Sequence, residues 1–515
     1  MGGVNSTVEF CCMRCTASKS YLFSLYLVFS LNPILAQDQI IFTLQGDHQS
    51  RLDYQFIGIG DQNGDGYDDI LVGREDHHAA VIYLGGEVMD TIPDFVIPVE
   101  TEDTFSFMWI SRLGDINDDG VIDFSVVVRD TTVSPGKGIS AVYMGGWPPQ
   151  EFFRYFGAPL KEGGDLNHDG FGDILSSWSV NIPNLQPYIY LFLGGEEPIM
   201  QVEDSILYTN TSTFIRPFKG VGMDISGNSI DDLIVIRSAT GIDGIAFDLF
   251  LGSESFSFTT ASSKSYPHNS GTVSFPGDMD GDGISEWVMS TTVIRPSLYA
   301  GGVDSLGGPH RIIPELTDEI RAYPYSVGDV NHDGYADLLL SDPFGSGGGG
   351  QLAVYLGGFH ADLRPDWHRT GWQFGLHLMG NSVEWCGDVN GDGCDDIMFG
   401  SDVLDTGIHP DKAMVIVAGD SSWYTNHTPY FESHLPEELS LSIPLNYELQ
   451  FNIQINELDP DANSAYWYVN DLLVRDTSNN NLSEDSYTFH SNSSYCQHDD
   501  LVLLRNPPSP KVVMF

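Results

Sequence analysis

Residues 58–73 read GIGDQNGDGYDDILVG, and residues 80–86 read AVIYLGG. The first stretch holds an acidic nine-residue loop, Asp-x-Asn-x-Asp-Gly-x-x-Asp, between two short apolar segments. The second is a short apolar segment that ends in two glycines. Both patterns recur along the chain, so the fold depends on what one copy of the repeat can form.

The acidic loop occurs seven times, with a spacing of 50 to 59 residues. The copies start at Asp61, Asp115, Asp165, Asp224, Asp278, Asp329 and Asp388. Each copy is followed by an apolar segment that ends at Gly86, Gly146, Gly195, Ser253, Gly302, Gly358 or Gly419. Because two separate motifs stay in step through every copy, the chain contains a repeat of about 50 residues.

One repeat unit contains four short apolar segments. In the first unit they are YQFIGIG (54–60), ILVG (70–73), VIYLGG (81–86) and DFVIPV (94–99). Four β-rich segments with turn residues between them are typical of a propeller blade. Seven units predict an all-β, seven-bladed β-propeller closed into a ring, with an open solenoid as the alternative. Gln39 to Leu44 resembles a fourth strand without its own blade, and we expect it to complete blade seven.

The acidic loops are predicted to bind calcium. Side chains at loop positions 1, 3, 5 and 9 and the carbonyl of position 7 can converge, and Gly at position 6 permits a left-handed turn. All these donors are oxygen atoms, which suits a hard cation with 6–8 ligands. The alternative is that the loops are solvated acidic turns. The predicted ligands are Asp61, Asn63, Asp65, Tyr67 and Asp69; Asp115, Asn117, Asp119, Val121 and Asp123; Asp165, Asn167, Asp169, Phe171 and Asp173; Asp278, Asp280, Asp282, Ile284 and Glu286; Asp329, Asn331, Asp333, Tyr335 and Asp337; and Asp388, Asn390, Asp392, Cys394 and Asp396.

The seven copies differ in their ligands. The fifth has four acidic residues but ends in Glu286, whose longer side chain alters the geometry. The fourth, DISGNSIDD from Asp224, has Ser229 in place of the glycine and offers Ser226 and Asn228 between its aspartates. We expect the fourth loop to bind metal weakly or not at all.

These motifs resemble the FG-GAP and VCBS-type repeats of the integrin α-subunit propeller and its bacterial relatives. Gln373-Phe374-Gly375 is similar to the "FG" element and Ser341-Asp342-Pro343 to the "GAP" element. The resemblance extends from Gln39 to Asp420 and implies a propeller with structural calcium. It says less about function, because this scaffold serves adhesion, sugar binding and polysaccharide lysis.

The remaining segments complete a predicted domain order. Residues 1–36 are predicted to be a signal peptide, since an apolar run from Tyr21 to Ala36 follows Arg14 and Lys19. An uncleaved anchor helix is the alternative. The propeller is predicted over residues 37–420 and a linker over 421–435. Residues 436–515 resemble an immunoglobulin-like or PKD-like β-sandwich that is not necessarily complete.

Charge and cysteine content exclude several functions. The 72 acidic residues outnumber the 22 Lys and Arg, giving a net charge of −50, which disfavours nucleic acids and anionic membranes as partners. Beyond the predicted leader, Cys386, Cys394 and Cys496 remain, too few for a disulfide framework or a zinc site. Pairing of Cys386 with Cys394 across a hairpin stays open.

The face opposite the acidic loops is the expected ligand side, because the resemblance places ligands there. Its loops are predicted at Glu75–His78, Asp130–Gly138, Asn181–Tyr188 and Asp366–Trp372. The last loop brings together Trp367, His368, Arg369 and Trp372, which would suit a sugar or peptide, although aromatic residues between blades also serve packing.

The chain has no recognisable catalytic motif, and we predict no catalytic residue and no cofactor except calcium. We expect a secreted or cell-surface binding and adhesion module with structural calcium. Its predicted partner is an extracellular protein or glycan, with no nucleic acid and no membrane span after signal cleavage. A calcium-dependent propeller polysaccharide lyase, or another carbohydrate-active enzyme, is the alternative. The sequence does not specify the ligand or the oligomeric state.

Overall fold

A computed structural model of the chain describes most of residues 40–423 and the strands between 430 and 513. Within 40–423 it leaves out 49, 75–76, 100–107, 130–137, 158, 179–187, 197, 199–201, 208–214, 218–222, 239–243, 260–261, 268–270, 292–295, 303–310, 313–321, 359–364 and 404–409. The predicted signal peptide lies outside the described residues. So do Cys496, half of the predicted ligand-side loop at Glu75–His78, and most of the two at Asp130–Gly138 and Asn181–Tyr188.

Six four-stranded antiparallel sheets, blades 1 to 6, follow one another along the chain. Blade 1 is β2 (Phe56–Gly60), β3 (Asp69–Arg74), β4 (Ala79–Tyr83) and β5 (Phe95–Pro98); blade 2 is β6 (Met108–Gly114), β7 (Asp123–Arg129), β8 (Gly138–Met144) and β9 (Gln150–Gly157); blade 3 is β10 (Leu160–Gly164), β11 (Asp173–Trp178), β12 (Tyr188–Phe192) and β13 (Asp204–Leu207). Blade 4 is β14 (Ile215–Pro217), β15 (Leu233–Ser238), β16 (Gly244–Phe250) and β17 (Ser262–Pro267); blade 5 is β18 (Gly271–Gly277), β19 (Glu286–Thr291), β20 (Ser297–Tyr299) and β21 (Arg311–Ile312); blade 6 is β22 (Tyr323–Gly328), β23 (Asp337–Asp342), β24 (Gln351–Tyr355) and β25 (Trp367–Thr370). The all-β propeller prediction is confirmed.

A five-stranded sheet, here called the closing sheet, differs from the six blades. It consists of β1 (Ile40–Gly46), β26 (Leu376–His377), β27 (Val383–Trp385), β28 (Ile397–Val403) and β29 (Lys412–Val417). Its inner strand is divided, because β26 and β27 pair with opposite ends of β28. The prediction of seven similar blades is therefore confirmed for six of them, and the closing sheet departs from the four-stranded pattern.

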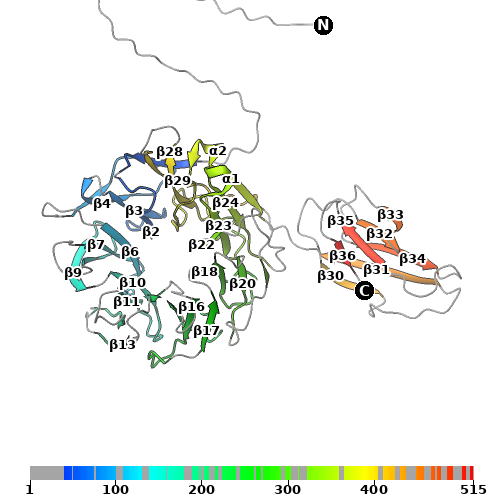
Figure 1. Ribbon diagram of the computed structural model, residues 1–515, viewed down its shortest axis with the longest axis horizontal. Coiled ribbons are helices and arrows are strands. Elements are labelled where there is room, and N and C mark those ends of the chain that lie inside the picture. The colour runs from blue at the N-terminus through cyan, green and yellow to red at the C-terminus, as the bar shows by residue number, and fades with distance from the viewer. Residues whose placement is uncertain are drawn as a thin grey trace, which may run out of the picture. The chain divides into compact units, whose positions relative to one another are not determined.

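The closing sheet joins the two ends of the propeller segment. β1 pairs antiparallel with β29, with Phe42 opposite Ile416 and Leu44 opposite Met414. The expected pairing of the segment from Gln39 to Leu44 is therefore found, over Ile40–Gly46. Figure 1 shows the sheets arranged around a common centre, with β2, β6, β10, β18 and β22 innermost.

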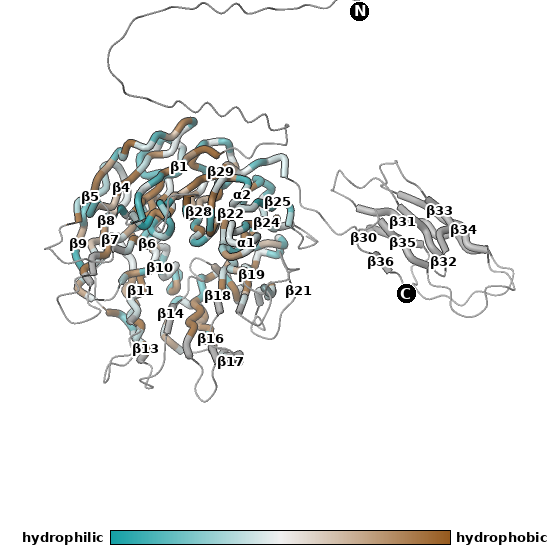
Figure 2. Tube along the Cα trace, turned by 45° about the horizontal axis from the view of Figure 1, so that its top comes forward, coloured by the Kyte–Doolittle hydropathy of each residue, from teal (hydrophilic) through white to brown (hydrophobic). Residues whose placement is uncertain are grey.

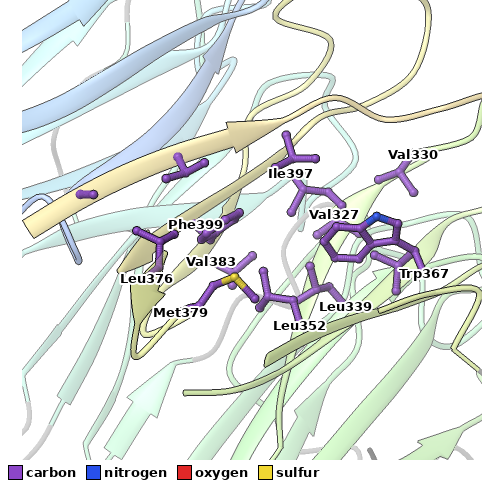
Figure 3. Close-up of a cluster of buried hydrophobic side chains, with 14 of the residues drawn as sticks. Val327, Val330, Leu339, Leu352, Trp367, Leu376, Met379, Val383, Ile397 and Phe399 are labelled. Atoms are coloured by element: carbon purple, nitrogen blue, oxygen red, sulfur yellow. The ribbon is translucent and has the colours of Figure 1, made fainter. Parts of the chain in front are cut away.

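The hydrophobic core lies between the sheets, and each boundary has its own cluster of buried side chains. Figure 2 shows the hydrophobic stretches along the strands of the ring. Figure 3 shows the cluster between blade 6 and the closing sheet, where Leu339 and Leu352 face Val383 and Phe399. Another cluster joins the closing sheet to blade 1 through Phe42, Leu44 and Phe56 among others. The ring is closed, which excludes the open solenoid.

The strands after the propeller form two further sheets. One has the order β30 (Tyr430–Leu435), β31 (Glu448–Asn456) and β34 (Glu484–His490). The other has the order β33 (Leu472–Asp476), β32 (Ala465–Val469), β35 (Leu501–Arg505) and β36 (Lys511–Val513). The immunoglobulin-like module stays a prediction, as do the domain boundaries. Among the described residues, no helix has the length and apolar character needed to cross a bilayer.

Candidate metal-binding loops

Each acidic loop connects the inner strand of its sheet to the second strand. Position 9 of the loop coincides with the start of the second strand in blade 1, where Asp69 opens β3, and in blade 5, where Glu286 opens β19. In these two blades the loop directly follows the inner strand, β2 or β18, and its last residue opens the second strand, so the sheet anchors both ends of the loop. Because the strands are antiparallel, all seven loops lie at the same ends of their sheets.

The aspartate at position 1 folds the loop around its own carboxylate. In blade 1, Asp61 Oδ1 accepts the N–H groups of Gly64 at 2.7 Å and Asp65 at 3.2 Å. Asp61 Oδ2 accepts the N–H of Gly66 at 2.8 Å. The other position-1 aspartates accept backbone N–H groups in the same way. The loop shape is thus fixed by a residue that was predicted only as a metal ligand.

Two residues of each loop adopt left-handed backbone conformations. The expected one is position 6, with φ of +91° at Gly66. Position 4 is also left-handed, with φ of +60° at His168 and +58° at His332. In the fourth loop, Ser229 holds position 6 at φ of +64°, so that loop keeps the turn at a cost in strain that a glycine would avoid.

Position 9 is buried and holds the loop to the third strand of its sheet. Asp337 Oδ2 accepts the N–H of Val330 at 2.8 Å, and Asp337 Oδ1 accepts the N–H of Gly357 at 2.7 Å. The other position-9 aspartates make the same two bonds. This contact explains why the acidic loop and the apolar segment ending in two small residues occur together.

Burial raises the pKa of these position-9 carboxyls, since the charged form loses its hydration. The pKa is raised to about 7 at Asp69, Asp123 and Asp173, and to about 8 at Asp396. Carboxylates at positions 1 and 5 of the same loop raise it further. Backbone N–H donors oppose the shift without cancelling it. A bound cation would remove this penalty.

Positions 3, 5 and 7 are in contact through hydrogen bonds. Asn63 Nδ2 donates to Asp65 Oδ2 at 2.9 Å, and the N–H of Tyr67 donates to Asp65 Oδ1 at 3.1 Å. The same contact between positions 5 and 7 occurs in the loops of blades 2, 3, 5 and 6 and of the closing sheet. The structure therefore brings together the positions that the sequence selected.

Blade 5 supplies the tightest carboxylate cluster among the described residues. One ligand oxygen from each of Asp278, Asp280 and Glu286 lies within 4.8 Å of the others. Glu286 Oε1 is buried without a hydrogen-bond partner, and so is Asn331 Oδ1 at position 3 of the blade 6 loop. Two orphaned oxygens at predicted ligand positions fit a hard cation. The acidic clusters are thus consistent with metal binding.

The fourth loop keeps the fold with fewer charges. Asp224 accepts the N–H groups of Gly227 and Asn228, as in the other copies. Asn228 replaces the position-5 carboxylate, and its Nδ2 donates to the carbonyl of Gly252 at 3.1 Å. The Asn228 side chain therefore braces the loop against Gly252, whereas position 5 of the other loops is a carboxylate that can bind a cation.

Position 8, which the sequence analysis did not select, links neighbouring loops. The N–H of Asp68 donates to the carbonyl of Asp388 at 3.0 Å, and the N–H of Asp388 donates to Asp68 Oδ2 at 2.9 Å. Asp395 and Asp329 make the same reciprocal pair at 3.0 and 2.9 Å. The sequence feature that could have indicated this role is the doubled aspartate at positions 8 and 9, which by itself resembles a simple acidic run.

The predicted loop Asp366–Trp372 is largely a strand, so that prediction was wrong. Trp367 lies in β25, is 3% exposed and packs near Trp423, with ring centroids 5.7 Å apart. Trp372 lies in the short helix α2 (Gly371–Phe374) and is 47% exposed, with its Nε1 donating to the carbonyl of Ser346 at 2.6 Å. Trp367 lies in the strand and Trp372 in the helix that follows it, so one of the two tryptophans is buried and the other is exposed.

Cys386 and Cys394 are both buried and free, so the hairpin disulfide is not formed. Cys386 Sγ donates to the carbonyl of Asp396 at 3.1 Å. Burial raises the pKa of the Cys386 thiol well above its ordinary value, which keeps it neutral.

Comparison with known proteins identifies an FG-GAP repeat over residues 326–355. These residues include the blade 6 loop and β24. The chain is also similar to integrin alpha-PS5 of Drosophila melanogaster, with 34% identity over 222 residues. That match covers 38% of this chain and 21% of the relative, so the chain spans about a fifth of the length of that protein.

Proposed function

We propose that this chain, which carries an FG-GAP repeat and is distantly homologous to integrin α subunits, is an extracellular binding or adhesion module stabilised by calcium. In this proposal the closing sheet serves as the seventh blade of the ring. The N-terminal segment directs export, and the loops hold the metal. The observation that carries the proposal is the set of acidic loops built into a closed propeller.

The metal part rests on the charge and donor chemistry of the loops. Two carboxylates about 4 Å apart repel by about 4 kcal/mol at an effective dielectric constant of about 20. One ligand oxygen from each of Asp278, Asp280 and Glu286 lies within 4.8 Å of the others, so this repulsion acts in the blade 5 loop. Calcium, when bound, supplies charge neutralisation and a template for the loop, with ligands at positions 1, 3, 5, 7 and 9.

The binding part rests on an exposed aromatic pair at the end of blade 6 opposite the metal loops. Phe344, between β23 and β24, is 53% exposed, and Trp372 is 47% exposed. The indole of Trp372 is fixed by its bond to Ser346 and by an edge contact with His377, 4.8 Å between ring centroids. A rigid exposed aromatic surface beside polar groups suits a protein or glycan ligand.

Calcium removal tests the metal part. If six loops each sit at ten times their dissociation constant, calcium adds about 1.4 kcal/mol per loop and about 8 kcal/mol in all. We expect metal depletion to lower Tm by about 10 °C or more, and elemental analysis of the repleted protein to find about six calcium ions per chain. An unchanged Tm after depletion would contradict calcium stabilisation.

Ligand screening tests the binding part separately. Arrays of glycans and extracellular-matrix proteins, probed with and without calcium, should show calcium-dependent binding that Trp372→Ala weakens about tenfold or more. Trp147→Ala is the matched control, because Trp147 is 41% exposed in blade 2, at the metal-loop end. If both variants lost affinity equally, or if Trp372→Ala left the affinity unchanged, the ligand would bind elsewhere on the protein.

A further inference from the structure

Arg112 makes an unusual set of contacts at the centre of the ring. It lies on β6, the inner strand of blade 2, and its Nε donates to Glu162 Oε2 of blade 3 at 2.9 Å. Its Cζ also lies 5.0 Å from the ring centroid of Trp385, on β27 of the closing sheet. One side chain therefore contacts two sheets besides its own, one of which is not adjacent to blade 2.

The sheets come close enough for this contact because blade 1 is narrow at its inner strand. Gly58 of β2 lies against β27, where a Cβ would be 2.6 Å from the carbonyl oxygen of Trp385. On the other side, a Cβ on Gly114 would lie 3.2 Å from Glu162 Oε1. Because both positions are glycine, no Cβ atom crowds Trp385 or Glu162, the two residues that Arg112 contacts.

The groups around the guanidinium form a site with defined chemistry. Trp385 offers an aromatic face, Glu162 offers a carboxylate, and both contacts are mostly shielded from water, with side-chain exposures of 24% for Arg112 and 13% for Glu162. Burial alone would lower the pKa of Arg112, but Glu162 and Glu384 outweigh it, so the pKa is raised and the cation is favoured. An aromatic face with a carboxylate recognises planar organic cations.

The indole is itself held in place. Trp385 Nε1 donates to Asp395 Oδ2 at 3.4 Å, and Asp395 Oδ2 also accepts the N–H of Asp329 at 2.9 Å. A Cβ on Gly328 would clash with this Asp395 carboxylate. The aromatic wall of the site is therefore preorganised by the neighbouring loops and does not depend on Arg112 for its orientation.

We infer that the centre of the ring contains a binding site for a planar organic cation, built from Trp385 and Glu162, and that Arg112 occupies it from within the same chain. In a chain with 22 Lys and Arg against 72 acidic residues, this internal cation neutralises carboxylates at the axis. It also ties blades 2 and 3 to the closing sheet.

Chemical rescue tests the site. Arg112→Ala should lower Tm by about 4 °C or more, and about 10 mM guanidinium should restore at least half of that loss, whereas NaCl at equal ionic strength should not. Arg154→Ala is the matched control, because Arg154 pairs with Glu151 on the exposed outer strand of the same blade. We expect Arg154→Ala to cost less than about 1 °C and to show no rescue.

Adding Trp385→Leu to Arg112→Ala should abolish the rescue. Failure of guanidinium to rescue, or equal rescue by NaCl, would overturn the inference. If Arg112→Ala does not fold, a double-mutant cycle of Trp385→Leu and Glu162→Gln replaces it. Arg112 connects these two residues, so their effects on Tm should be non-additive; strict additivity would overturn the inference as well.

Discussion

The position-9 carboxylate shows how one residue type can serve two purposes in the loop. Asp337 is fully buried and accepts two backbone N–H groups from different parts of its blade. Asp333, at position 5 of the same loop, is exposed and accepts hydrogen bonds from Asn331 Nδ2 and from the N–H of Tyr335, both within that loop. The first residue therefore stabilises the blade with or without a metal, whereas the second matters mainly for the metal.

Asp337→Asn and Asp333→Asn should separate these roles. Asp337→Asn places an NH2 group against a backbone N–H, so we expect a loss of about 1–3 kcal/mol in unfolding free energy, both with calcium and after metal depletion. Asp333→Asn should have a lower unfolding free energy than the wild type in calcium and the same unfolding free energy after metal depletion. Urea unfolding under both conditions measures the difference. Equal behaviour of the two variants would contradict the division of roles.

At the scale of elements, a buried ion cluster fastens the turn between β1 and β2 to the closing sheet. Lys412 of β29 lies 3.0 Å from Asp53 Oδ2 and also contacts Asp402, its cross-strand partner on β28. Asn381 Nδ2 donates to Asp53 Oδ2 at 3.4 Å. The side chain of Asp53 is 1% exposed, so its charge depends on Lys412 for compensation.

Lys412→Met should destabilise the ring by about 3–5 kcal/mol, since it leaves two buried carboxylates without a cation. The double variant Asp53→Asn/Lys412→Met should recover part of the loss, because it removes one of the two uncompensated charges. Urea denaturation of both variants measures this recovery. A single variant as stable as the wild type would show that the cluster contributes little.

Sequence patterns predicted the elements that repeat and missed those that depend on distant contacts. The seven acidic loops and the apolar segments that follow them were identifiable because hydrophobic runs and glycines keep a fixed order. The segment around Trp367 was placed in a loop because its short alternation, Trp-His-Arg-Thr, lacks the apolar run of the other strands. The roles of Asp68 and Asp395 depend on the preceding loop in the ring, which no local pattern reveals.

At the scale of the whole molecule, the ring concentrates negative charge in a belt of loops joined to one another. The chain carries a net charge of −50, and a carboxyl at position 9 is buried in every sheet of the ring, as an aspartate in six of them and as Glu286 in blade 5. Reciprocal bonds such as Asp68 with Asp388 connect one loop to the next. The protonation of the position-9 carboxyls therefore affects every sheet of the ring.

Metal-depleted protein should become less stable as pH rises from about 5 to about 8. Burial raises the folded-state pKa of Asp69, Asp123 and Asp173 to about 7, whereas unfolded aspartate titrates near 3.9. The folded state therefore binds more protons in this range, so stability falls as pH increases. We expect Tm to drop by about 5 °C, and saturating calcium to remove or reverse the trend. A Tm that rises with pH in the metal-depleted protein would contradict the raised pKa values of the position-9 carboxyls.

The antiparallel pairing of β1 with β29 decides how the ring would respond to mechanical tension. Ile40, where the ring begins, pairs with Val417, the last residue of β29. A pull on the two ends of the ring would load this terminal pair first and peel the hydrogen bonds apart one by one, rather than shear them together. Under such tension, the seam between β1 and β29 would open before any blade unravels.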